Sequence, residues 1–383
     1  MHLPLIARRR FLALSAGAGA LMVAPQMVLA TVPGERRFVF IIQRGAADGL
    51  NIVVPYADPA YATLRRELAI DPARATKLDG HFALHPALAQ MGQMYGQGQA
   101  LFIHAVASPY RDRSHFDGQN VLETGGVHPY AVRDGWLNRL VGLMPRTAER
   151  AIAIAATVPP ALRGPVAVES YAPSSLSQPS DDLMRRVGQL YASDTQLHPL
   201  WSAALDASEA ADSLAVRQDA AEVGKLAAKF LTKPNGPRIA MLETGGWDTH
   251  TGQEARLSAQ LRALDTLIAS LREGMGAAWA STTVLIATEF GRTAAANGTG
   301  GTDHGTGSVA MLVGGAVRGG RVLADWPGLA QAQLYEGRDL RPTIGLDAVI
   351  AGAASEALGL APDLTARTLF AGIPGKPQTG LIV

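Results

Sequence analysis

Residues 283–320 read TVLIATEFGRTAAANGTGGTDHGTGSVAMLVGGAVRGG, and this stretch carries the densest chemistry in the chain. Two apolar runs, Val284–Ala287 and Val309–Val313, bracket a loop that is rich in Gly, Thr and Asn. Short apolar runs bounded by such residues are typical of buried strands. Ligands of open α/β sheets bind at the carboxyl ends of strands, so the polar groups of this loop are candidates for a site. They are Glu289, Arg292, Asp303 and His304.

The composition excludes several classes of protein and site. The chain has 383 residues, a formal net charge of +1 and no cysteine. Disulfides, thiolate metal sites and a cysteine nucleophile are therefore excluded. Any metal must be held by oxygen or imidazole ligands, which suit zinc, manganese, magnesium or calcium. The near balance of charge gives no indication of nucleic-acid binding.

The first 30 residues have the pattern of an export signal. Arg8–Arg10 precede an apolar run that reaches Val23, and Val28–Ala30 form a small-residue cleavage site. Residues 1–30 are therefore expected to be a signal peptide, and the arginines followed by Phe-Leu predict the twin-arginine translocation machinery as a partner. An uncleaved anchor is the alternative, but the apolar run is short and interrupted by glycine. The expected protein is periplasmic or secreted, with no stable membrane span after cleavage.

The mature chain, residues 31–383, is expected to be a single α/β domain. Apolar runs at Phe38–Ile42, Ala100–Ala107 and Arg238–Leu242 predict further buried strands. The leucine spacing between Glu254 and Leu271 predicts an amphipathic helix against a sheet. Strands alternating with helices predict a three-layer sandwich, in which a mostly parallel central sheet is covered on both faces.

Candidate functional side chains follow several of these strands. Asp48 lies in a Gly-rich turn after the first strand, where a metal ligand and a turn carboxylate fit equally well. Asp248 and His250 share one loop after the strand that ends at Leu242. This pair has two interpretations, which are metal binding and a structural Asp–His hydrogen bond.

Ser114 precedes a predicted helix and has two interpretations. Serine is a favoured N-cap residue, which is the simpler explanation. A hydroxyl at a helix N-terminus, beside Arg113 and His115, is also suited to attack an anionic ester, because free N–H groups and positive charge bind anions there.

The order and spacing of these groups resemble the alkaline phosphatase superfamily, which includes phosphatases, sulfatases and cofactor-independent phosphomutases. In that superfamily an early strand ends in a metal-binding Asp, a Ser or Thr nucleophile opens a helix, and later loops add Asp and His ligands. The resemblance implies that Ser114 is the nucleophile, with His115, Arg113 and Arg292 as catalytic or anion-holding neighbours. It also implies a divalent metal site drawn from Asp48, Asp248, His250, Glu289, Asp303 and His304, with Asp303 as a partner that orients the imidazole of His304.

The mature chain as a whole resembles a bacterial family of exported proteins, the domain of unknown function 1501 family. The matching motifs are spread from Arg44 to Gly328, so the resemblance covers nearly all of the mature chain. They are Asp48–Asn51 with Val54–Tyr56, Leu84–Leu88, Arg113–Asp117, Gly246–His250, Thr288–Thr293 and Gly301–Gly305.

Two departures from the superfamily pattern bear on the metal. Phe290 stands where the superfamily has a histidine ligand. Gly252 lies four residues after Asp248, where the Asp-x-x-x-His motif of the superfamily has its histidine. One site is expected to remain, made of Asp248, His250 and His304. The other retains only oxygen donors, better suited to calcium, magnesium or no metal; these are Asp48, Glu289 and Ser114.

Three functions remain as hypotheses. The first is an exported metal-dependent hydrolase of phosphate or sulfate esters that acts on a small anionic ester. The second is a catalytically degenerate alkaline phosphatase-like protein that binds an envelope polymer or a partner protein, which the loss of a ligand at Phe290 favours. The third is a metal-free Ser–His–Asp esterase that uses Ser114, for which the sequence offers no Gly-x-Ser-x-Gly elbow.

Overall fold

The structure is a computed structural model of the chain. It describes residues 36–145, 151–172, 219–370 and 375–383, together with seven single positions. The signal peptide expected at residues 1–30 lies outside the described residues. Within the described ranges, no helix is both long and apolar enough to cross a membrane.

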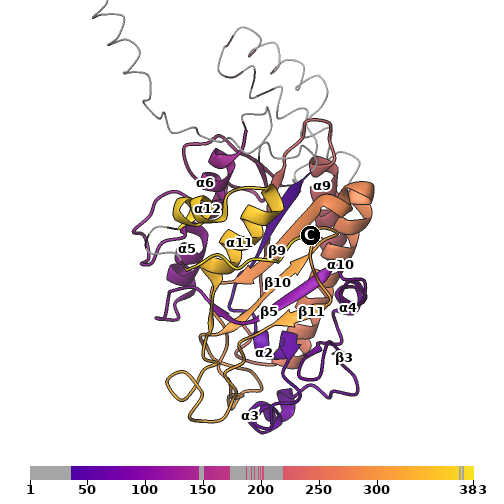
Figure 1. Cartoon of the computed structure of the whole chain (residues 1–383), viewed down its shortest axis with the longest axis vertical. Coiled ribbons are helices and arrows are strands. Elements are labelled where there is room, and N and C mark those ends of the chain that lie inside the picture. The colour runs from indigo at the N-terminus through magenta and orange to yellow at the C-terminus, as the bar shows by residue number, and fades with distance from the viewer. Residues whose placement is uncertain are drawn as a thin grey trace, which may run out of the picture.

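A nine-stranded sheet runs through the described part of the chain (Figure 1). Its strand order is β11-β5-β10-β9-β1-β8-β6-β7, and β12 pairs with β5. The strands are β1 (Arg37–Gln43), β5 (Ala100–Ala107), β6 (Ala151–Ile154), β7 (Glu169–Tyr171), β8 (Ile239–Thr244), β9 (Thr282–Thr288), β10 (Ser308–Val313), β11 (Arg321–Leu323) and β12 (Ile344–Gly345).

β1 lies between β8 and β9 and is parallel to both. Phe40, for example, is paired with Met241 on one side and with Leu285 on the other. β10 is antiparallel to its neighbours β5 and β9, because the loop between β9 and β10 returns the chain without a crossover helix. The prediction of a mostly parallel central sheet is confirmed, with β10 as the reversed strand.

Helices cover both faces of the sheet. Successive side chains of β1 point to opposite faces, so each face of the strand packs into a separate apolar core. Val39 and Ile41 belong to one apolar core, whereas Phe38 and Phe40 belong to another. The predicted three layers are therefore present (Figure 1). The first core includes α4 (Ala89–Gly96), α9 (Ala220–Leu231) and α10 (Gln253–Met275), and the second includes α6 (Trp136–Leu143), α11 (Leu346–Leu358) and α12 (Pro362–Leu369).

Shorter elements connect these layers. After β1, a small antiparallel sheet and several short helices precede β5. The small sheet has the order β2-β4-β3. These elements are α2 (Gly49–Ile52), β2 (Val53–Val54), α3 (Tyr61–Arg65), η1 (Arg66–Leu68), β3 (Thr76–Lys77) and β4 (Ala83–Leu84), and later in the chain come α5 (His115–Thr124), η2 (Pro160–Leu162) and η3 (Gly276–Ser281).

The carboxyl ends of β1, β8 and β9 meet at one edge of the sheet, because the three strands are adjacent and parallel. Gly45, which follows β1, lets the loops after β1 and β8 approach each other closely. Its φ is +118°, and a Cβ atom there would lie 2.7 Å from the backbone nitrogen of Asp248. Any larger residue would push the two loops apart.

Candidate metal centre

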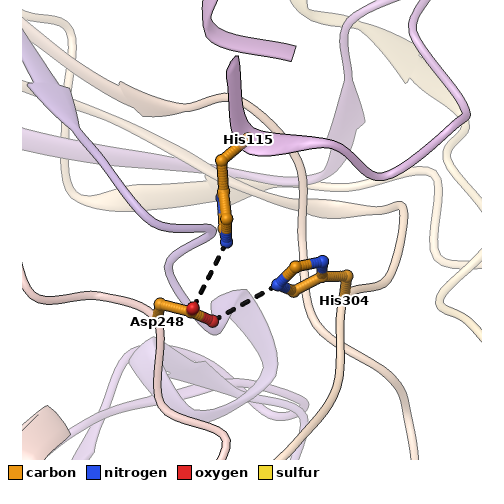
Figure 2. Close-up of side chains that lie close together, drawn as sticks. All are labelled: His115, Asp248 and His304. Atoms are coloured by element: carbon orange, nitrogen blue, oxygen red, sulfur yellow. Dashed lines mark ion pairs between the residues drawn. The ribbon is translucent and has the colours of Figure 1, made fainter. Parts of the chain in front are cut away.

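Three side chains from separate segments of the chain gather at this edge of the sheet. Asp248 follows β8, His304 lies in the loop between β9 and β10, and His115 is the first residue of α5 (Figure 2). One ligand atom from each lies within 4.8 Å of the others. The carboxylate of Asp248 lies between the two rings, with Oδ2 3.5 Å from Nε2 of His115 and Oδ1 3.3 Å from Nε2 of His304.

His250 completes a tight triangle of donor atoms. Its Nε2 atom lies 3.0 Å from Oδ1 of Asp248 and 3.0 Å from Nε2 of His304. The third side of the triangle is the 3.3 Å between Asp248 and His304. A tetrahedral zinc ion with bonds of about 2.0 Å has ligand atoms about 3.3 Å apart, so this triangle has the size of one face of such a site.

The three imidazoles are oriented in the same way. Each ring places its Nδ1 atom against an oxygen outside the cluster, so Nδ1 carries the proton and Nε2 turns a lone pair toward Asp248. The partners are Glu289 Oε1 for His115 (2.9 Å), Asp303 Oδ1 for His250 (3.0 Å) and the Arg113 carbonyl oxygen for His304 (2.9 Å).

This orientation leaves nitrogen lone pairs that need a cation or a proton. The Nε2 atoms of His250 and His304 face each other at 3.0 Å, where two lone pairs repel unless something positive lies between them. The Nε2 atom of His115 is buried and has no hydrogen-bond partner. Buried polar atoms without partners are rare, so the donor set fits a bound divalent metal.

The charges of the cluster favour the protonation states that bind metal. Burial would raise the pKa of the Asp248 carboxyl, but the hydrogen bond and positive charge of Arg292 lower it below its usual value. Burial lowers the pKa of His304, and the neighbouring His115 lowers it further. An ionised carboxylate and a neutral imidazole are the forms that coordinate a cation.

Glu289, expected as a metal ligand, is placed instead to orient His115. It is fully buried at the end of β9. Its Oε1 atom accepts hydrogen bonds from the backbone of Gly45 at 2.8 Å and from Gln119 at 3.1 Å, and Oε2 accepts one from Thr288 at 3.0 Å. Burial would raise the pKa of Glu289, but the hydrogen bonds from His115 and Gln119 lower it. The hydrogen bond with Glu289 in turn raises the pKa of His115.

Asp48, also expected as a ligand, is engaged elsewhere. Its two oxygens accept hydrogen bonds from Arg65 at 2.6 and 3.0 Å in a fully buried ion pair. Gln253 donates a further hydrogen bond at 2.5 Å. These donors occupy both oxygens of Asp48, so Asp48 is not among the proposed metal ligands.

Asp303 lies beside the cluster rather than within the donor triangle. Its Oδ1 atom contacts His250 at 3.0 Å and accepts a hydrogen bond from Asn297 at 3.2 Å. It therefore orients the ring of His250, whereas the sequence suggested His304 as the ring that it would orient.

The expected catalytic residues Ser114 and Arg113 lie at the start of α5, and Arg292 lies in the loop after β9. Ser114 is the N-cap residue of α5, and its side chain makes no capping hydrogen bond. The guanidinium of Arg113 pairs with Asp339 at 2.9 Å and Glu336 at 2.5 Å. Arg292 is buried and donates to Asp248 at 2.6 Å and to the backbone oxygen of Thr302. Both arginines expected to hold an anion are thus engaged by protein groups.

Two features of the site were not assigned from the sequence. The sequence indicates Phe290 only as a lost ligand, but its ring stacks on His115, with centroids 5.1 Å apart, and lies 5.4 Å from the ring of His304. It thus forms an apolar wall for both imidazoles. Gln119, four residues after His115, lies on the same side of α5 and shares Glu289 with it. Residues four apart on a helix are neighbours, so this spacing could have indicated that the two side chains share a partner.

The chain matches one protein family over most of its length. Residues 35–360 match the model of the family described as Protein of unknown function (DUF1501). No curated protein sequence matches the chain.

Several solved structures are similar to the chain. The C-terminal periplasmic domain of EcEptC from Escherichia coli in complex with Zn is 9% identical, with 73% of this chain and 72% of that chain covered and a TM-score of 0.38. The phosphonate monoester hydrolase of Agrobacterium radiobacter is 11% identical, with 86% and 75% covered and a TM-score of 0.37. Ps i-CgsB in complex with k-i-k-neocarrahexaose is 10% identical, with 73% and 65% covered and a TM-score of 0.36. These TM-scores are too low for the chemistry of those proteins to be carried over.

Proposed function

Starting from a chain that belongs to the family described as Protein of unknown function (DUF1501), we propose that the cluster is the divalent-metal centre of an exported hydrolase. Its substrates are phosphate or sulfate esters. Asp248, His250 and His304 hold the metal, because their three donor atoms are 3.0 to 3.3 Å apart. Nitrogen and oxygen ligands in this number suit zinc or manganese.

The observation that carries this proposal is the shared direction of the imidazoles. His250 and His304 both have Nδ1 held from outside and Nε2 turned inward, 3.0 and 3.3 Å from Oδ1 of Asp248. Metal-binding histidines have this arrangement, in which the outer hydrogen bond fixes the tautomer and the ring orientation. A structural Asp–His pair would require only one such ring.

The reaction proposed for this site depends on the start of α5. A bound divalent metal would polarise the ester and offset the negative charge on its oxygens. Ser114, whose hydroxyl is not used as a helix cap, attacks the phosphorus or sulfur atom and forms a covalent Ser114 ester as the bond to the leaving alcohol oxygen breaks. The Nε2 atom of His115 accepts the Ser114 proton and passes it to the leaving alkoxide, while Glu289 stabilises the protonated ring. Water then hydrolyses the Ser114 ester and restores the hydroxyl. N–H groups in the first turn of α5 donate to the anionic oxygens in place of the engaged arginines.

Activity of the purified, exported chain tests this proposal. Hydrolysis of p-nitrophenyl phosphate and p-nitrophenyl sulfate is measured before and after Ser114→Ala, with Ser258→Ala on α10 as the matched control. We expect Ser114→Ala to lower turnover about a hundredfold or more while the metal content stays unchanged. Activity that is indifferent to Ser114→Ala, or a protein without divalent metal, ends the proposal.

We also propose export through the twin-arginine translocation machinery, on the strength of residues 1–30. Replacing both Arg8 and Arg9 by Lys tests the route, because that machinery recognises the arginine pair. The doubly substituted chain is expected to stay in the cytoplasmic fraction of the host. Unchanged export of this variant contradicts the route.

A catalytically degenerate protein that binds an envelope polymer or a partner protein is the second candidate. The engagement of Arg113 by Asp339 and of Arg292 by Asp248 favours it, since neither guanidinium is free to hold a transferred group. A metal-loaded chain that binds a sulfated polysaccharide and hydrolyses neither nitrophenyl ester would support this candidate over the hydrolase.

A further inference from the structure

A cleft of about 570 Å³ borders α5, the helix that begins at His115, and is within the size range of small-molecule sites. Two strands that end at this edge of the sheet contribute to it, since Arg44 follows β1 and Glu243 belongs to β8. Gln119 of α5 connects it with the centre, because its side chain lines the cleft and also donates to Glu289, the carboxylate that orients His115. A molecule in this cleft would therefore contact α5 at Phe116, the residue that follows His115.

One wall of the cleft carries two exposed aromatic rings. Phe116 is 83% exposed and Tyr130 is 65% exposed, and both line the cleft. The side chain of Asn120 accepts a hydrogen bond from the backbone nitrogen of Tyr130 at 2.7 Å, which keeps Tyr130 beside α5. Among the described residues, no other aromatic side chain is so exposed. Exposed apolar rings that share one cleft mark a binding surface rather than a part of the core.

The charged residues of the cleft leave a surplus of positive charge. Arg44 is paired with Glu123 at 2.9 Å and with Glu243 at 2.6 Å, so these two carboxylates share one guanidinium. Arg133 and Arg163 also line the cleft, and both are exposed. Their guanidinium groups suit a carboxylate or sulfate substituent of a bound molecule.

From this lining we infer that the cleft binds the part of the ester that is not transferred, and that this part is a sugar ring bearing an acidic group. A sugar ring has an apolar C–H face that packs on Phe116 or Tyr130 and a rim of hydroxyls that amide and carboxylate side chains can bind. The acidic substituent pairs with Arg133 or Arg163. This inference rests on the proposed hydrolase and specifies its substrate as an ester of an acidic saccharide.

Binding to the purified, metal-loaded chain tests the inference by calorimetry. The probes are a sulfated, heparin-derived tetrasaccharide, the neutral cellotetraose and adenosine monophosphate. We expect the sulfated tetrasaccharide to bind best, and expect Phe116→Ala and Arg133→Gln each to raise its Kd about tenfold. The matched controls lie on α12, where Leu364→Ala and Arg367→Gln are expected to leave the Kd unchanged.

Hydrolysis of the two nitrophenyl esters, measured on the same variants, separates this inference from the proposed reaction. Tetrasaccharide binding that Phe116→Ala weakens, in a chain that hydrolyses no ester, supports the cleft and overturns only the hydrolase. Ester hydrolysis combined with equal tetrasaccharide affinity in all variants, or with no binding, overturns the cleft and leaves the hydrolase. Preference for cellotetraose or for adenosine monophosphate overturns the assignment to an acidic sugar.

Discussion

The Nδ1 atom of His304 lies 2.9 Å from the backbone carbonyl oxygen of Arg113. Arg113 adopts a φ of +61°, a left-handed conformation that is unfavourable for a residue with a Cβ atom and persists only where neighbours hold it. Its guanidinium is held by the buried Asp339, with distances of 3.1 and 2.9 Å. Thr306 donates a further hydrogen bond to the same carboxylate at 2.8 Å. Asp339 therefore fixes the loop whose carbonyl group orients a proposed metal ligand.

Asp339→Asn is expected to weaken metal binding without removing a ligand. The change replaces the carboxylate by a neutral amide that holds the Arg113 guanidinium less strongly, so the carbonyl that orients His304 is less firmly fixed. The loss of such an outer partner typically lowers metal affinity about 10–100-fold. Competition with a chromophoric zinc chelator measures the affinity, and circular dichroism confirms that the variant is folded.

Glu336→Gln is the matched control for this change. Glu336 pairs with the same guanidinium of Arg113, but its side chain is 56% exposed. Exposed ion pairs contribute about 0–1 kcal/mol, so a small effect on zinc affinity is expected. Equal zinc affinity in folded Asp339→Asn and in the wild type would show that the Arg113 carbonyl does not orient His304.

Asp48→Asn is expected to destabilise the fold and to leave the metal in place. The substitution leaves the guanidinium of Arg65 buried without its carboxylate, which typically costs about 3–5 kcal/mol of unfolding free energy. Urea unfolding measures the loss, and mass spectrometry measures the metal. Loss of metal with unchanged stability would instead make Asp48 a ligand, as the sequence suggested.

Two buried histidines outside the centre predict lower stability in mild acid. Burial lowers the pKa of His85 to about 4 and that of His104 to about 4. Both rings use Nδ1 to accept a backbone N–H, from Ala87 at 3.0 Å and from Ala105 at 2.8 Å, so protonation there breaks a hydrogen bond. An unfolded imidazole titrates near pH 6.5. The stabilisation that comes from keeping these two imidazoles neutral is therefore complete above that pH and is lost as the pH falls toward 4.

Urea unfolding at pH 7 and pH 5 checks this pH dependence. Each histidine is expected to remove on the order of 2 kcal/mol of unfolding free energy by pH 5. The control is His85→Asn, whose side-chain oxygen can accept the same hydrogen bond and cannot be protonated. Its loss between the two pH values is expected to be smaller than that of the wild type. Equal losses in the two proteins would exclude His85 as a cause.

The sheet and its main helices were predictable because they depend on local patterns. The apolar runs after Arg36 and Thr283 became β1 and β9, and the leucine spacing after Glu254 became α10. The direction of β10 was not predictable, because its pairing with β5 joins segments about two hundred residues apart in sequence. Periodicity within a strand does not specify the direction of its neighbours.

The site was predictable as a set of loops but less so in its individual roles. Asp248, His250 and His304 follow or precede strands that the sequence reveals, and the structure brings them together. The engagement of Asp48 depends on Arg65, which lies in a short helix with no motif of its own. The inward direction of His115 depends on Glu289, 174 residues later in the chain. Such pairings are set by the packing of loops rather than by local sequence.

The metal content of the exported chain, measured by mass spectrometry after purification from the host, tests the metal centre most directly. The account predicts about one divalent metal per chain, in keeping with a single set of donor atoms. His304→Ala is expected to lose the metal, and the exposed His128→Ala is expected to retain it. A wild-type chain without metal, or equal metal in the His304→Ala and wild-type chains, would contradict the account.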